Sequence, residues 1–170
     1  MASIGHAAVG LLGARLHDRA PPSLRSALLL TALSYLPDAD VGMFLWVGYD
    51  HPLGHRGAAH SLCFALAAGL VTGLFARGLD HPRSLRLGAF AVLVVASHGL
   101  LDTMTAGGGR GVALLWPFDL TRYWSPWRPI PIAPIGLDYL SRRGLEVLVV
   151  ESLQFLPCFL LAFLPARPRG

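Results

Sequence analysis

Histidine and aspartate side chains occur at four places in a sequence that is otherwise strongly apolar. These places, in chain order, are His6; Asp38 and Asp40; His55 and His60; and His98 and Asp102. Each lies at or beside the end of an apolar segment, where an ionisable group is costly unless it is paired or bound to a metal. Because proteins bind zinc and similar divalent ions through imidazole and carboxylate groups, the pattern indicates a site for one or two such ions, with zinc preferred.

The pair His98 and Asp102 ends an apolar segment. A spacing of four residues places both side chains on one face of a helix, within reach of a common ion. A plain salt bridge at the helix end is the alternative. For His6 the alternative is a hydrogen-bonded structural histidine, and we expect a ligand there because of the other three clusters.

Asp38 and Asp40 follow Pro37, which disfavours helix at the residue before it. The Asp-x-Asp turn brings two carboxylates into one small volume. Capping of the next helix would explain one of them, but not both. We expect Asp40 to be a ligand, and Asp38 to be either a ligand or the base that takes a proton from water.

His55, Arg56 and His60 stand at the mouth of an uncharged segment. The histidines are five residues apart and do not share a helix face, so we expect His55 to precede the helix and His60 to start it as a ligand. His55 is either a ligand or a general acid. The Arg56 guanidinium suits a pair of phosphate oxygens and would stabilise charge in a transition state. A solvated polar turn is the alternative.

The composition is that of a membrane protein. Hydrophobic residues make up 54% and charged residues 14% of the 170 residues, against about 25% charged in typical soluble domains. The excess charge of +4 comes from 14 arginines and no lysine. These arginines lie in short clusters between apolar runs, which is typical of membrane anchoring and argues against nucleic-acid binding.

Five apolar segments predict an all-α fold, a bundle of about five short transmembrane helices in a single domain, residues 1–170. The segments are 4–14, 24–36, 61–76, 87–101 and 144–165. Only the last reaches the ~20 residues that a comfortable span needs, so we expect short or partly re-entrant helices.

The linkers predict the orientation. Eight arginines lie in residues 15–25, 77–86 and 165–170, whereas the longer linkers 37–60 and 102–143 hold the other six and almost every polar cluster. With five crossings the positive-inside rule places the first class in the cytoplasm and the metal site outside it. The linker 102–143 also carries Trp116, Tyr123, Trp124 and Trp127, which we interpret as an interfacial belt, and a turn at Gly107–Gly111 that lacks the Gly-Lys-Ser/Thr of a phosphate loop.

The clusters together resemble a known family, the YdjM-like inner-membrane metal-dependent hydrolases. The matching stretches are Leu36-Pro37-Asp38-Ala39-Asp40, His55-Arg56-Gly57-Ala58-Ala59-His60-Ser61, Ser97-His98-Gly99-Leu100-Leu101-Asp102 and Leu114-Leu115-Trp116-Pro117-Phe118. They cover about residues 1–120. More distantly, the order of His6, the Asp pair, the His pair and His-x-x-x-Asp is similar to the zinc phospholipase C and P1 nuclease superfamily, without its full set of ligands unless Glu146 or Glu151 contributes.

The resemblance implies metal-assisted hydrolysis, for which we expect a lipid or lipid-linked phosphate ester as substrate. We expect Glu151, deep in the last segment, to accept from a ligating imidazole, or else to be a protonated glutamic acid bonded to a neighbouring helix. Two other functions stay open. A metal or proton transporter would line such groups through the membrane, and a non-catalytic scaffold with a structural metal would not need Arg56 beside its ligands.

Overall fold

The computed structural model describes residues 4–107, 110–134 and 136–165. Gly108 and Gly109 of the predicted turn and the tail arginines Arg167 and Arg169 lie outside these ranges. The described chain forms α1 (Ile4–Asp18), α2 (Leu24–Tyr35), α3 (Leu62–Gly78), α4 (Ser84–Thr103), α5 (Arg142–Gln154) and α6 (Leu156–Phe163), the 3-10 helices η1 (Leu36–Leu45), η2 (Ala58–His60) and η3 (Gly136–Leu140), and the parallel strands β1 (Thr105–Ala106) and β2 (Ile130–Pro131). It is therefore mostly helical, as the sequence predicts.

Three of the helices begin where a serine supplies an N-cap. Ser23, Ser61 and Ser141 precede α2, α3 and α5, and each hydroxyl oxygen accepts a hydrogen bond from the backbone N–H three residues later. This bond satisfies one of the free N–H groups of the first turn. Because Ser61 is the cap, His60 lies just before α3, in η2, and does not start the helix as we expected.

The last apolar segment is not one straight helix. It breaks at Phe155 into α5 and α6, which are bent by 56°. Pro157 has no N–H to donate to the carbonyl of Leu153 and its ring crowds that carbonyl, so the helix cannot continue unbroken. The pair would cross a membrane only as a broken span.

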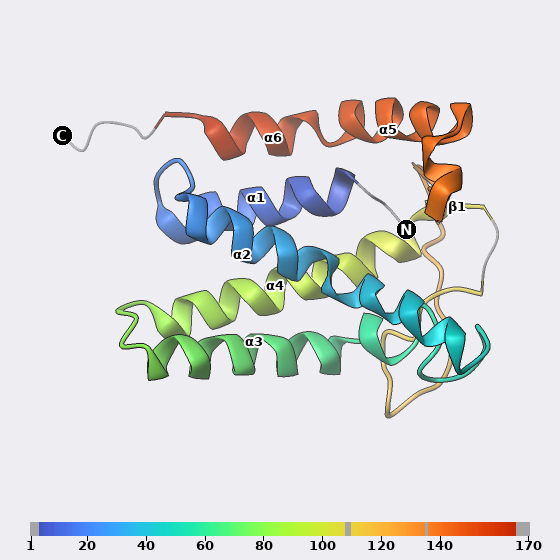
Figure 1. Ribbon diagram of the computed structural model, residues 1–170, viewed down its shortest axis with the longest axis horizontal. Helices are drawn as coiled ribbons and strands as arrows, with labels where there is room; N and C mark the ends of the chain where they lie inside the picture. The colour runs from blue at the N-terminus through green and yellow to red at the C-terminus, as the bar shows by residue number, and fades with distance from the viewer. Residues whose placement is uncertain (1–3, 108–109, 135, 166–170) are drawn as a thin grey trace.

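The helices lie roughly side by side, with α5 and α6 along one edge of the view, α1 and α2 next to them and α3 and α4 at the opposite edge (Figure 1). The α1–α2 and α3–α4 turns lie at one end of the bundle, and η1, β1 and the loops around them lie at the other. We call the first the basic end, since Arg15, Arg19, Arg25, Arg77, Arg83 and Arg86 belong to it. We call the second the site end.

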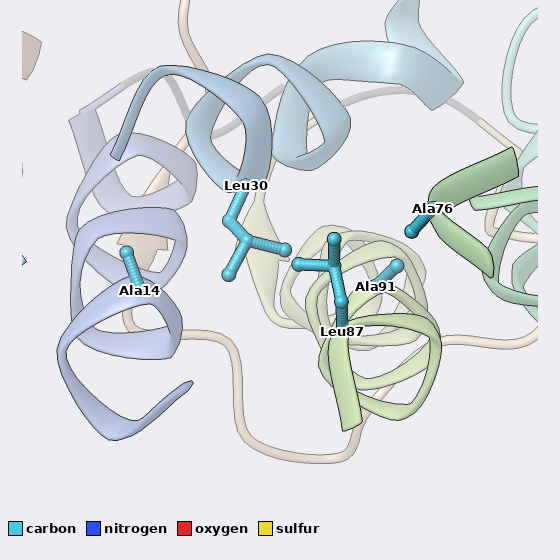
Figure 2. Packing of buried hydrophobic residues seen from close by; sticks show 5 residues of the cluster. All are labelled: Ala14, Leu30, Ala76, Leu87 and Ala91. Carbon is cyan, nitrogen blue, oxygen red and sulfur yellow. The ribbon is translucent and has the colours of Figure 1, made fainter. Parts of the chain in front are cut away.

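The core between the helices is built from small and branched side chains. Leu30 of α2 and Leu87 of α4 extend toward each other, with Ala14, Ala76 and Ala91 around them (Figure 2). Small residues also let α3 and α4 approach closely: a Cβ on Gly88 would lie 2.9 Å from the carbonyl oxygen of Gly69. Close packing through small residues is typical of helices in membranes.

Large apolar side chains cover the outside. On α3, Leu66, Leu70, Val71, Leu74 and Phe75 are 59 to 71% exposed. Such a face is unfavourable in water and favourable against lipid chains. Among the described residues, α4 is the one helix long and apolar enough to cross a membrane alone, α5 with α6 passes as a bent pair, and α3 is a shorter apolar helix.

Candidate metal centre

Four separate elements bring the predicted residues together at the site end. His6 comes from the first turn of α1, Asp38 and Asp40 from η1, and His98 and Asp102 from the end of α4. The fourth element is the segment from His55 to His60, which folds over the end of the bundle. His6, His55, His60, His98 and Asp102 are each at most 3% exposed, and Asp40 is 8% exposed.

Four of these side chains form a group that we call the quartet: Asp38, His60, His98 and Asp102. Their facing atoms are close together. His60 Nε2 lies 3.5 Å from Asp38 Oδ1, 3.5 Å from Asp102 Oδ2 and 3.2 Å from His98 Nε2, and His98 Nε2 lies 3.3 Å from Asp38 Oδ1. Ligands bound to zinc at 2.0–2.1 Å in a tetrahedron are about 3.3–3.4 Å apart. These four distances are those of a tetrahedral zinc site, and all the ligand atoms of the quartet lie within 4.8 Å of one another.

The two quartet histidines are oriented by partners behind them. His98 Nδ1 lies 2.7 Å from the carbonyl oxygen of Ser34, to which it donates, so the lone pair of this ring is on Nε2, the atom that faces the quartet. His60 Nδ1 lies 3.0 Å from Asp40 Oδ2. A carboxylate or carbonyl behind a histidine is the usual support of a metal-binding imidazole.

Asp40 is thus placed beside the quartet. Its Oδ1 accepts a hydrogen bond from His55 Nδ1 at 2.7 Å, and its Oδ2 accepts from the backbone N–H of Arg56 at 3.2 Å. Asp40, His55 and His60 form a second group with a ligand atom of each within 4.8 Å of the others. The two groups share His60, one through Nε2 and the other through Nδ1.

His6 adjoins the quartet from α1. Its ring stacks on that of His98 with centroids 3.7 Å apart and an angle of 11° between the planes, and its Nε2 is 3.6 Å from Asp102 Oδ1. His6 is fully buried, and neither ring nitrogen has a hydrogen-bond partner within the described part of the chain. A buried histidine in this condition is unusual in a native protein unless an ion or ordered water completes it.

Arg56 is buried next to the same aspartate. Its Nε lies 3.1 Å from Asp102 Oδ2, its Nη2 donates to Thr105 Oγ1 at 3.0 Å, and its Cζ lies 5.3 Å from the ring centroid of Trp124. Its Nη1 is buried without a hydrogen-bond partner in the described ranges. The structure therefore places a cation with a free donor beside the quartet.

The electrostatics of the site favour a cation. Burial raises the pKa of Asp38 and of Asp40, but the facing imidazoles outweigh it and hold both below their ordinary values. Burial lowers the pKa of His60, yet Asp102, Asp38 and Asp40 outweigh it and raise this pKa to about 10. In the absence of a metal ion, a proton on His60 thus balances part of the carboxylate charge.

Glu151 holds the helix that carries His6. Its Oε2 accepts hydrogen bonds from the backbone N–H groups of Ile4, at 2.8 Å, and Gly5, at 3.3 Å. A carboxylate there satisfies the free N–H groups of the first turn and interacts favourably with the helix dipole. Glu151 is thus bonded to a neighbouring helix, as one of the two expected roles has it, and it acts on His6 through the start of α1.

Sequence reasoning missed the supports of the site. Ser34 and Thr105 are ordinary residues in sequence, and only the fold shows that they orient His98 and Arg56. Arg122 holds the loop before Arg56 through the carbonyl oxygens of Tyr49 and His55, both at 3.0 Å. Its place beside Tyr123 and Trp124 in a polar linker was a signal for a partly buried cation.

The aromatic residues of the predicted interfacial belt do not all have the same surroundings. Trp127 is 67% exposed and is free to meet an interface. Trp124 instead contacts two guanidinium groups, those of Arg56 and Arg128, whose Cζ atoms lie 5.3 and 5.2 Å from its ring centroid. Trp124 therefore forms part of the wall of the site, and the belt role stays a prediction for the others.

Comparison with known proteins adds two findings. Residues 1–166 match the family model described as the YdjM inner membrane protein. The inner membrane protein YbcI of Escherichia coli (strain K12) is 39% identical over 152 residues, which are 87% of this chain and 86% of that protein. No solved structure gives a significant match. The family resemblance is confirmed, whereas the distant similarity to zinc phospholipase C and P1 nuclease stays a hypothesis.

Proposed function

The chain belongs to the YdjM inner membrane protein family, and from this premise we propose that it is a membrane-bound metal-dependent hydrolase. The observation that carries the proposal is the quartet of carboxylate and imidazole groups, in which four pairs of facing atoms lie 3.2 to 3.5 Å apart and all ligand atoms lie within 4.8 Å of one another. That spacing and that donor set fit zinc or a similar divalent ion. Such an ion lowers the pKa of a water molecule that it binds to about 7.

The residues of the chain divide into ligands and supports. Asp38, His60, His98 and Asp102 hold the ion. His6, stacked on His98 and 3.6 Å from Asp102, is either a fifth ligand or an acceptor for the proton of the attacking water. A second ion, if present, would take Asp40 and His55, which otherwise orient His60.

Arg56 supports a phosphate ester as the substrate. Its Nη1 is a buried donor without a partner among the described residues, and its Nε is fixed 3.1 Å from Asp102. A guanidinium held in this way meets a phosphate oxygen without loss of side-chain freedom, and it stabilises the charge that develops during hydrolysis. His55 is available as a general acid through the Asp40 carboxylate that it contacts.

The place of the site supports a lipid substrate. It lies at the end of the bundle, where Leu45, Trp46 and Trp127 are 67 to 79% exposed and would meet the membrane interface. We propose five crossings, with α5 and α6 as one broken span, and an extracytoplasmic site end. The arginines of the basic end support this orientation by the positive-inside rule.

A structural metal in a non-catalytic scaffold is the second candidate. One observation favours it: the quartet supplies four protein ligands, and a tetrahedral ion with four protein ligands has no open position. The free donor of Arg56 favours the hydrolase. A transporter is less favoured, because the described ligand groups gather at one end of the bundle and do not continue along its length.

Purified protein distinguishes these functions. We expect the full chain in mild detergent to contain one or two equivalents of zinc or a similar ion, and to hydrolyse a long-chain lipid phosphate faster than its short water-soluble analogue. His98→Ala should lower both metal content and turnover, turnover by at least about 100-fold. His51→Ala changes an exposed histidine of the same end and should leave both unchanged.

Two outcomes would contradict parts of the proposal. Equal turnover of the long-chain and short-chain esters would refute the lipid substrate and retain the hydrolase. Full metal content with no turnover of phosphomonoesters, phosphodiesters or carboxylic esters would refute the hydrolase in favour of the scaffold.

A further inference from the structure

A cavity of about 560 Å³ opens at the basic end, far from the metal centre. Its volume is in the usual range for ligand pockets, 300–1,000 Å³. The apolar wall comes from three helices and the turn after α3, with Leu29 of α2, Val71 and Phe75 of α3, Leu79 of the turn and Leu87 of α4. Leu29, Val71, Phe75 and Leu79 are 39 to 71% exposed, so nothing in the described chain covers this wall.

Polar groups gather at one end of the same cavity. His17, Asp18, Ser23, Arg25 and His81 line it, and they belong to the parts of the chain around the α1–α2 and α3–α4 turns, which lie at the same end of the bundle (Figure 1). Val71 and Leu79 are eight residues apart, so the apolar wall extends about 12 Å along the bundle from this polar end. The cavity is thus shaped for a molecule with a polar head and an apolar chain.

His17 supplies a buried polar atom that lacks a hydrogen-bond partner among the described residues. The residue is 4% exposed, and its Nδ1 lies 2.8 Å from Asp18 Oδ1, to which it donates. Its Nε2 is buried and has no hydrogen-bond partner within the ranges that the structure describes. Buried polar atoms are normally satisfied, so a bound molecule is expected to reach Nε2.

Asp18 is hydrogen-bonded within the protein, and arginines outnumber it at this end of the bundle. Its Oδ2 accepts hydrogen bonds from the Ser23 backbone N–H at 2.7 Å and from Ser26 Oγ at 2.5 Å, and its Oδ1 accepts from His17. These donors occupy both carboxylate oxygens, and the one negative charge of Asp18 is outnumbered by the arginines around it. Arg25 is exposed at the mouth of the cavity, and Arg19, Arg77 and Arg83 are exposed at the same end of the bundle. The charge complementarity is therefore to an anionic head.

We propose that this cavity binds one anionic phospholipid of the leaflet at the basic end. Its phosphate is held by Arg25, a hydroxyl of its head donates a hydrogen bond to His17 Nε2, and the upper part of one acyl chain covers Val71, Phe75 and Leu79. Hydrocarbon burial along this wall contributes affinity, and the arginine selects the charge. The site is independent of the metal centre.

Lipid titration tests the proposal. The full chain in mild detergent is titrated with dioleoyl-phosphatidylglycerol and with dioleoyl-phosphatidylcholine, and bound lipid is counted by native mass spectrometry. We expect one tight phosphatidylglycerol site, about tenfold stronger than for phosphatidylcholine, as one charged contact would give. Arg25→Gln should remove this preference, whereas Arg77→Gln, an exposed arginine outside the cavity lining, should keep it.

A matched pair of variants tests the location. Val71→Trp fills the cavity and should weaken phosphatidylglycerol binding by at least about tenfold. Leu70→Trp places the same side chain on the next residue of α3, 62% exposed and outside this cavity, and should bind as the wild type does. Similar binding by both variants would overturn the proposal, since the lipid would then be annular only.

Competition binding and a measurement of the oligomeric state distinguish the lipid from the other molecules that could occupy the cavity. Dihexanoyl-phosphatidylglycerol should bind more weakly than the dioleoyl lipid, and inorganic phosphate should not displace it. Displacement of the lipid by inorganic phosphate would show that the cavity binds anions in general, and it would overturn the proposal of a lipid site. A dimer in the wild type that Val71→Trp dissociates, without any effect of lipid, would show that a second copy covers the wall and would also overturn the proposal.

Discussion

At the scale of single residues, His60 is the most important residue of the candidate metal centre, because it belongs to both groups of possible ligands. Its Nε2 faces the quartet while its Nδ1 lies 3.0 Å from Asp40 Oδ2. The carboxylate therefore fixes the ring, sets which nitrogen can bind the ion, and makes the imidazole a stronger donor.

Removing the charge of Asp40 tests this support. Asp40→Asn should lower zinc affinity by about 10- to 100-fold, because the amide orients His60 more weakly and no longer balances its charge. Asp50→Asn is the control, since Asp50 is an exposed partner of Arg110 at the same end. Isothermal titration of the metal-free protein measures both. An unchanged affinity in Asp40→Asn would mean that Asp40 does not support the site.

The pH dependence follows from two opposite shifts. The pKa of His60 is raised from 6.5 to about 10, so its stabilisation of the metal-free protein is full below pH 6.5 and is lost as the pH rises through about 10. The pKa of Asp40 is lowered from 3.8, so its contribution is full above that value and is lost in acid. These two groups together stabilise the metal-free protein most between about pH 4 and 6.5.

The metal-bound protein should behave differently. A histidine binds an ion only after it loses its proton, so zinc affinity should increase from pH 6 to pH 8 and binding should release protons. Thermal unfolding of chelator-treated and zinc-loaded protein across this range measures both effects. A metal-free protein that gains stability from pH 6.5 to 10 would contradict the charge assignment of His60.

At the scale of elements, α4 positions the candidate metal centre because it brings two of the proposed ligands and accepts a neighbour at close range. His98 and Asp102 lie on one face of it, and Gly99 lies where η2 passes. A Cβ on Gly99 would be 2.3 Å from the carbonyl oxygen of His60. The missing side chain thus lets the His60 backbone rest directly on α4.

Gly99→Ala should push η2 away from α4 and separate His60 from His98. Because a shift of even 1 Å breaks the tetrahedral spacing, we expect loss of bound metal and destabilisation of about 1–3 kcal/mol from overpacking. Gly78→Ala is the matched control in a helix, since nothing lies within 4 Å of the added Cβ. Metal content and thermal unfolding are the measurements. Full metal content in Gly99→Ala would show that the close approach is not needed.

At the scale of the molecule, the described chain separates its charges between its two ends. The candidate metal centre and its carboxylates lie at one end, and six arginines lie at the other. If the helices cross the membrane, the two ends meet opposite leaflets. The metal site and the proposed lipid site are then reached from different sides.

Topology reporters test this arrangement. A fusion after Gly170 should report a cytoplasmic C-terminus, and a cysteine in the turn at Arg19 should be labelled only after the membrane is opened to the cytoplasm. A cysteine at Asp50, in the exposed loop of the site end, should be labelled from outside. Labelling of Asp50 and Arg19 positions from the same side would contradict the five crossings.

Some features of this protein depend on local physics and were predictable from the sequence. The apolar segments predict helices close to α1, α2, α3 and α4, because burial and backbone hydrogen bonding in an apolar chain leave few other choices. The spacing of His98 and Asp102 predicts one helix face, since 3.6 residues per turn is a local property. The four polar clusters were sufficient to name the residues that the structure brings together.

Only the tertiary structure shows which of those residues belong to the quartet and which support it from behind. Asp38 and Asp40 are equivalent in sequence, yet one faces the quartet and the other lies behind His60, because that choice depends on how η1 crosses the end of α4. The acceptor of His98 is a backbone carbonyl 64 residues away, and Glu151 caps a helix that starts 147 residues earlier. The pattern of apolar residues indicates which side chains are buried but not which neighbours they contact. Contacts between residues so far apart in the sequence are therefore determined only by the packing of the helices.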